Sequence, residues 1–179
     1  INILRRYSGT SDYWVIIPGK AKSAATMVSF GASKIFMGPA SELGPIDPQF
    51  SLIEDGRKKR FSVFNIVASY TALFERATKE KGNLQPYLQQ LSRYDAREIK
   101  EFEDAISLSE DIAIKALKTG MMSSVAVTEI KKKINKFLTP EETKAHGRLI
   151  DRNEAEACGL VIKKVNINDK MWDPAYELY

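Results

Sequence analysis

A serine at position 23 lies between an apolar run and a stretch of small residues, a setting suited to nucleophilic chemistry. The run at residues 13–17 predicts a strand buried on both faces, and residues 23–30 predict a short helix ending at Gly31. A hydroxyl in the first turn of a helix meets the positive end of the helix dipole, and the free amides there can bind an oxyanion. The position equally allows Ser23 to act only as the cap of its helix.

The residues around Ser23 are small or basic. Ala24, Ala25 and Gly31 would let a substrate or a backbone approach closely. Lys20 and Lys22 flank the serine, and we expect them to contribute only electrostatically.

A loop rich in proline and glycine occupies residues 37–49 and follows a second short strand at residues 34–37. Strand, helix and strand within so short a stretch form a βαβ unit, whose two strands run parallel. The segment leaving the second strand should therefore emerge beside Ser23. We expect residues 41–49 to pack there as one wall of a substrate groove, with Asp47 capping a turn or orienting a base.

The remaining sequence is dominated by helical periodicity. Helices are predicted at 61–79, 84–91, 95–118 and 125–138, and a last edge strand at 160–165. Capping boxes are predicted at Thr139 to Glu142 and at Asp151 to Glu154, the second helix stopping at Gly159. Together these elements predict an α/β fold with a helical second half.

The composition excludes several classes of protein. The chain has 179 residues, of which 44% are hydrophobic and 28% charged, so one globular domain spanning 1–179 is expected. A single cysteine, Cys158, excludes an internal disulfide framework, and a single histidine, His146, excludes metal sites built from several imidazoles. We expect no cofactor. No apolar run is long enough to span a membrane, and the start at Ile1 suggests that upstream sequence is missing.

The net charge of +4 comes from the first third of the chain, where residues 57–60 are all basic. Such a run could contact phosphates, which would make the protein a nucleic-acid-associated module. No aromatic residues interleave the charges, so a solvated loop before a helix is the favoured interpretation, and nucleic acid is not an expected partner.

Three strings in this chain resemble the serine dehydrogenase proteinase family, which belongs to the Clp protease and crotonase fold class. They are Ala-Lys-Ser-Ala-Ala-Thr-Met at 21–27, Lys-Ile-Phe-Met-Gly at 34–38 and Ser-Glu-Leu-Gly-Pro-Ile-Asp-Pro-Gln at 41–49. Segments at 109–118 and 146–160 look like the family's C-terminal helix and its ending. The resemblance implies a crotonase-like (Clp protease-like) βαβ superhelix whose N-terminal strands this chain lacks.

The resemblance also implies a serine peptidase mechanism. Ser23 matches the nucleophile, and the amide of Ala24 would hold the oxyanion together with a glycine amide that residues 1–22 do not supply. Relatives place a lysine base near the helix after the proline-rich loop, which favours Lys59, with Lys58 as its neighbour. Lys115, placed on the buried side of its helix, and His146 are the other candidates.

The expected partners follow from the same resemblance. They are a peptide or protein substrate and further copies of this chain in a homo-oligomer, in the cytoplasm or at a membrane through upstream residues. A non-catalytic scaffold or peptide-binding subunit of the same fold is the alternative function, and solvent-facing lysines around Ser23 would favour it. Acyl-coenzyme A chemistry is disfavoured, since neither an oxyanion glycine nor a catalytic carboxylate is found.

Overall fold

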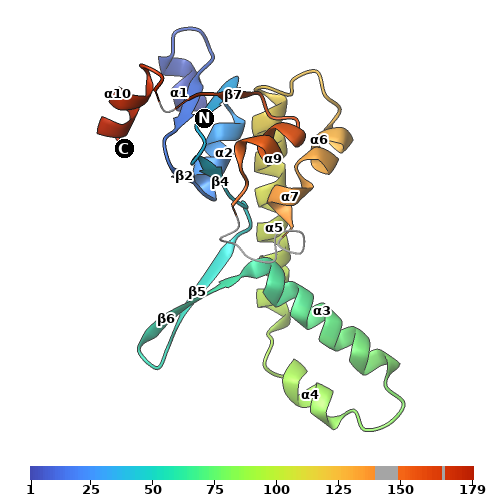
Figure 1. Ribbon diagram of the computed structural model, residues 1–179. Coiled ribbons are helices and arrows are strands. Elements are labelled where there is room, and N and C mark those ends of the chain that lie inside the picture. The colour runs from blue at the N-terminus through green and yellow to red at the C-terminus, as the bar shows by residue number, and fades with distance from the viewer. Residues whose placement is uncertain (140–148, 167) are drawn as a thin grey trace. The chain divides into compact units, whose positions relative to one another are not determined.

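The computed structural model describes residues 1–139, 149–166 and 168–179 (Figure 1). The chain divides into two compact units. Unit 1 combines Ile1–Ile46 with Glu110–Tyr179, and unit 2 is the intervening segment Asp47–Ser109. The architecture is mixed α/β with small sheets, as expected at that level. The interpretation of residues 1–179 as one domain stays a prediction.

A three-stranded parallel sheet forms the centre of unit 1. Its strands are β1 (Trp14–Ile17), β3 (Lys34–Met37) and β7 (Ile162–Lys164), in the order β1-β3-β7. Helix α2 (Ala24–Phe30) connects β1 to β3, so the predicted βαβ unit is confirmed. The last strand, β7, lies at the edge of the sheet, also as predicted.

The prediction that β1 is buried on both faces is wrong. Ile17 is buried and Val15 packs against the core, but Trp14 is 59% exposed and Ile16 is 38% exposed. Alternate residues of a strand point to opposite faces of the sheet. The apolar run therefore supplies two apolar faces, of which only the one bearing Val15 and Ile17 is covered in the described structure.

A second, two-stranded sheet lies beside the start of α2. It pairs β2 (Lys20–Ala21) in parallel with β4 (Glu42–Leu43). On its other side, Leu43 exchanges both backbone hydrogen bonds with Ile150, at 2.9 and 3.1 Å. This sheet fixes the loop after β3 next to the segment that leads into α2.

Helices surround these sheets in unit 1. They are α1 (Asn2–Tyr7), the second part of α5 (Ala96–Lys118), α6 (Val127–Lys133), α7 (Asn135–Leu138), α9 (Arg152–Ala157) and α10 (Trp172–Glu177). The predicted helix at 125–138 is interrupted at Ile134, and α1 and α10 were not expected. The capping box of α9 is confirmed, and Gly159 follows it at a φ of +83°.

Unit 2 contains a β-hairpin and helices. Its strands β5 (Gln49–Glu54) and β6 (Arg57–Ser62) are antiparallel, followed by α3 (Val63–Lys79), α4 (Gln85–Leu91) and the first part of α5. The interpretation of residues 57–60 as a loop is therefore wrong, although their side chains are exposed as expected. The helix predicted from Phe61 begins two residues later, because Phe61 and Ser62 still belong to β6.

The core of unit 1 packs the covered face of the sheet against the helices. Phe30 and Phe137 meet edge to face with ring centroids 5.1 Å apart, and both are fully buried. Ile35, Leu117 and Ile134 are fully buried as well. This core holds α2, and with it Ser23, in a fixed position.

Candidate functional site around Ser23

Ser23 has an unusual backbone conformation. Its φ is +51° and its ψ is −114°, values that a type II′ turn requires of its first central residue and that favour glycine. The amide of Ala25 donates to the carbonyl of Lys22 at 3.0 Å, which closes the turn around Ser23. A non-glycine residue held in this way stores strain, and such strain clusters at functional sites.

The side chain of Ser23 does not cap α2. No capping hydrogen bond joins its hydroxyl to the first turn, so the structural alternative of a simple helix cap is not supported. The amide of Ala24 makes no backbone hydrogen bond within residues 1–139, 149–166 and 168–179. Ser23 is half-buried and Ala24 is exposed, so both residues lie at the protein surface.

The proline-rich loop lies beside Ser23, as predicted. The amide of Ser23 donates to the carbonyl of Pro45 at 3.2 Å. Farther along the loop, the amide of Ile46 donates to the carbonyl of Phe137 at 2.9 Å. At its start, the Ser41 hydroxyl accepts from the amide of Gly38 at 2.8 Å and donates to the carbonyl of Ile17. The part of the loop that belongs to unit 1 is thus held at Ser41 and at Ile46.

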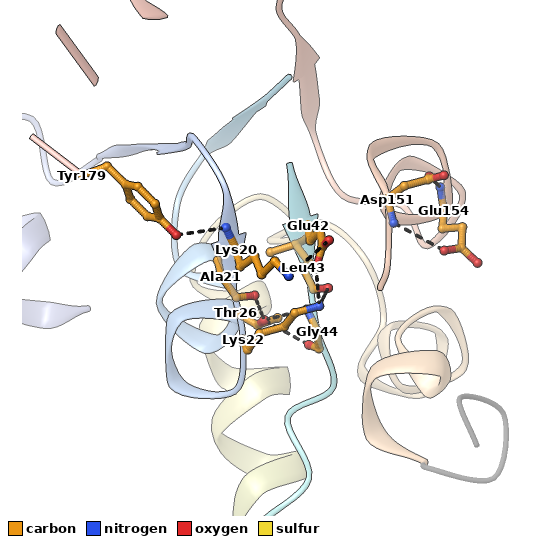
Figure 2. Close-up of polar contacts among 10 residues, drawn as sticks. All are labelled: Lys20, Ala21, Lys22, Thr26, Glu42, Leu43, Gly44, Asp151, Glu154 and Tyr179. Carbon is orange, nitrogen blue, oxygen red and sulfur yellow. Dashed lines mark hydrogen bonds and ion pairs between the residues drawn. The ribbon is translucent and has the colours of Figure 1, made fainter. Parts of the chain in front are cut away.

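Thr26 connects α2 to both strands of the small sheet. Its hydroxyl lies 2.8 Å from the carbonyl of Ala21 and 3.0 Å from the carbonyl of Gly44, and it accepts from the amide of Gly44 at 3.3 Å (Figure 2). Thr26 is fully buried, so these bonds are shielded from water. They hold the residue that follows the turn against the loop.

Lys22 is held by the loop rather than by Ser23. Its ammonium lies 3.0 Å from the Glu42 carboxylate and donates to the carbonyl of Leu43 at 3.0 Å (Figure 2). A Cβ at Gly44 would come within 2.2 Å of Lys22 Cδ, so glycine is needed for the lysine stem to cross the loop. These contacts direct the Lys22 ammonium to the loop, and no hydrogen bond joins it to the Ser23 hydroxyl in the described structure.

The far end of α2 is fixed by Tyr13. Its hydroxyl donates to the carbonyl of Val28 at 2.6 Å, and burial raises the pKa of the phenol. A Cβ at Gly31 would lie 2.4 Å from Tyr13 Oη. Gly31 therefore ends the helix as predicted, with an ordinary φ of −79°, and its missing side chain makes room for the tyrosine.

The candidate bases are not brought together with Ser23 by the described contacts. Lys59 and Lys58 lie on β6 in unit 2, whereas Ser23 lies in unit 1, and their pairing stays a prediction. Lys115 is exposed, so its expected place on the buried side of α5 is wrong; Ala113 and Leu117 occupy that side. His146 and most of the capping box predicted at Thr139 lie outside the described residues.

Two cavities lie elsewhere. One, of about 510 Å³, is an open pocket within unit 2 between the hairpin and α3 and α5; its lining includes Phe50, Phe61 and Phe102. The other, of about 450 Å³, is lined in unit 1 by Lys115 together with Ile1 and Ile3. Ser23 lines neither cavity, so neither is assigned to its chemistry.

In the part of the chain that the structure describes, no helix is both long and apolar enough to cross a membrane. The same residues contain no group of three or more histidine, cysteine, aspartate or glutamate side chains placed to hold a metal ion. No protein-family model, curated protein or solved structure matches this chain. The resemblance to the serine dehydrogenase proteinase family therefore stays a prediction.

Proposed function

We propose that this protein is a serine peptidase-like hydrolase with a crotonase-like fold, in which Ser23 is the nucleophile. One observation carries the proposal: a serine, not a glycine, holds a φ of +51° on the tight turn that opens α2, and its hydroxyl does not cap the helix. In known hydrolases, a strained turn between strand and helix exposes the nucleophilic hydroxyl in this way.

The proposed reaction is acyl transfer to Ser23. Its Oγ forms a bond to the carbonyl carbon of the peptide while its proton passes to the base. The base then returns a proton to the leaving amine as the C–N bond breaks, and water hydrolyses the acyl-enzyme by the same route. The amide of Ala24 supports the oxyanion, and the mechanism requires a second amide that residues 1–22 do not supply.

Lys59 is our first candidate for the base, with Lys58 and His146 as alternatives. The exposure of Lys115 argues against that lysine, because the apolar surroundings expected for a lysine base are absent there. Lys22 is not a candidate, because its ammonium contacts the Glu42 carboxylate and the Leu43 carbonyl.

Labelling with a fluorophosphonate probe tests the nucleophile. The wild type should be labelled on the peptide containing Ser23, and Ser23→Ala should not be labelled. Ser11→Ala is a matched control, because Ser11 is the other serine with a positive φ, at +57°, but opens no helix. Equal labelling of Ser23→Ala and Ser11→Ala would contradict the assignment.

A non-catalytic peptide-binding subunit is the second candidate function. It is favoured by the Lys20 side chain, which is 69% exposed, and by the Ser23 hydroxyl, which has no hydrogen-bonded base among the described residues. Peptide binding without labelling in the wild type would establish this function instead.

We also propose that the complete protein forms a homo-oligomer. Large apolar side chains are exposed in both units, among them Trp14, Ile53 and Phe74. Covering them with further copies of the chain would remove this surface from water. Light scattering on the complete protein at micromolar concentration tests this, and a stable monomer would contradict it.

A further inference from the structure

A turn that precedes Ser23 by a few residues binds two tyrosine side chains from the C-terminal part of unit 1. The Tyr176 hydroxyl donates to the carbonyl of Pro18 at 2.9 Å. The amide of Lys20 donates to the Tyr179 hydroxyl at 3.3 Å (Figure 2). Residues 18–20, here called the 18–20 turn, therefore offer an acceptor to the phenol of Tyr176 and a donor to the phenol of Tyr179.

The Lys20 amide points to the unpaired edge of β2. The amide of Glu42, on β4, donates to the carbonyl of Gly19 at 2.8 Å, so the peptide groups of Gly19 face the partner strand. Backbone groups alternate in direction along a strand, which turns the Lys20 N–H toward the opposite edge. An extended peptide adding to the small sheet would use this amide.

Gly19 provides the space for the phenol ring. A Cβ at this position would lie 3.0 Å from Tyr179 Oη and 3.2 Å from Tyr179 Cζ, closer than side chains ordinarily approach. A larger residue would displace the ring. Gly19, two residues beyond the end of β1, thus forms the base of a small aromatic subsite.

The tyrosine that fills this subsite is weakly held, whereas its helix is firmly anchored. Trp172, at the start of α10, is 3% exposed, and a Cβ at Gly38 would come within 2.6 Å of its ring. By contrast, Tyr179 is 70% exposed and Leu178 is 90% exposed. Few contacts hold the tip of this segment, so it can leave while Trp172 remains in place.

We propose that the 18–20 turn is a subsite for a tyrosine side chain of a bound peptide, and that Tyr179 fills it from within the same chain. A phenol suits the subsite because its oxygen can accept a hydrogen bond from Lys20 N–H, as that of Tyr179 does. Only Ala21 and Lys22 separate the turn from Ser23, so a peptide held there is presented to the nucleophile. The proposal rests on the proposed function only in this last step.

Peptide binding measured apart from catalysis tests the subsite. The probe is the fluorescein-labelled peptide Val-Thr-Tyr-Thr-Val, with Phe and Leu versions at the central position, followed by fluorescence anisotropy on the full chain. Tyr179→Phe removes the hydroxyl and Tyr179→Ala empties the subsite. Tyr7→Ala is the matched control, because Tyr7 is 85% exposed on α1.

Loss of one hydrogen bond in Tyr179→Phe should tighten binding of the Tyr peptide about 2- to 10-fold, and Tyr179→Ala should tighten it at least as much. The Tyr peptide should bind better than the Phe and Leu versions by a similar factor. Gly19→Ala should abolish this gain in affinity for the Tyr peptide, since the methyl group of the alanine narrows the subsite.

Equal affinities in Tyr179→Ala and Tyr7→Ala, or no binding to either, would overturn the proposal. These outcomes are separable from failure of the proposed function. If the probe labels Ser23 but the Tyr179 variants show no gain in peptide affinity, the subsite is contradicted and the nucleophile is supported. If peptide affinity rises but Ser23 is not labelled, the subsite is supported and the nucleophile is contradicted.

Discussion

The amide of Ser23 donates a hydrogen bond to the carbonyl of Pro45 at 3.2 Å, joining the start of α2 to the middle of the proline-rich loop. Each residue lies two positions beyond the end of a strand, β2 for Ser23 and β4 for Pro45, and these strands run parallel. The carboxyl ends of parallel strands meet at one edge of a sheet, which is why two segments separated in sequence become neighbours. The position of Ser23 is therefore set by the loop as well as by its own helix.

Replacing Ser23 with glycine should stabilise the protein. Glycine adopts a φ of +51° without steric conflict, whereas serine does not. After the larger entropy of the unfolded glycine chain is subtracted, we expect a gain of about 1 kcal/mol in the free energy of unfolding. Urea denaturation measures it. Ser23→Ala, which keeps the Cβ, should gain nothing, and a Ser23→Gly variant less stable than Ser23→Ala would contradict the strain.

Thr26→Val should destabilise the protein by about 1–3 kcal/mol, because the carbonyls of Ala21 and Gly44 would lose the hydroxyl to which they are bonded while remaining buried. Thermal unfolding with calorimetry measures the change. Thr26→Ser keeps the hydroxyl and loses only a methyl group, so it should cost about 1 kcal/mol. Equal losses in the two variants would show that packing, and not hydrogen bonding, holds α2 to the loop.

Lys59→Met should reduce the rate of fluorophosphonate labelling by about 10²- to 10⁴-fold if Lys59 is the general base. Lys115→Met should leave the rate unchanged, since Lys115 is exposed. Rates are compared over a pH series, because loss of the base should also flatten the pH profile. A normal rate in Lys59→Met with a reduced rate in Lys58→Met would transfer the role to Lys58.

The capping box of α9 should make stability depend on pH in the acid range. Amides of Glu154 and Asn153 donate to the Asp151 carboxylate at 2.8 and 2.7 Å and lower its pKa. The contribution is therefore present above the unfolded-state pKa of about 3.9 and is lost as the pH falls through the lower folded-state pKa. Asp151→Asn keeps the cap but should remove this part of the pH dependence, which denaturation curves between pH 2 and 6 would show. An unchanged profile in Asp151→Asn would contradict this origin.

Local pattern was enough to predict the parts of the fold that depend on neighbouring residues. The apolar run before Pro18 predicted β1, and Asp151 with Glu154 predicted the start of α9. The position of Pro45 beside Ser23 followed from the parallel strands alone. These predictions use rules that act within a few residues or within one βαβ unit.

Other features have no signal in local pattern. The positive φ of Ser23 contradicts the usual preference for glycine and could not be read from residue type. The hairpin of unit 2 was not predicted, because the basic residues 57–60 of β6 lack the apolar alternation typical of a strand. A signal was nevertheless present, since Asp55-Gly56 is a turn pair typical of hairpins and both residues have a positive φ. The role of Gly19 as the floor of an aromatic subsite depends on Tyr179, far away in the sequence.

The division of unit 1 into two sequence segments sets an order for its folding during synthesis. Unit 2 is one continuous segment, Asp47–Ser109, so all its contacts are available once that segment has left the ribosome. In unit 1, by contrast, β3 cannot pair with β7 until Ile162 has been synthesised. The hydrogen bonds between the 18–20 turn and the side chains of Tyr176 and Tyr179 also cannot form until those residues have been synthesised. The nascent chain must therefore carry the strained Ser23 turn without its complete support until translation has passed the last of these residues.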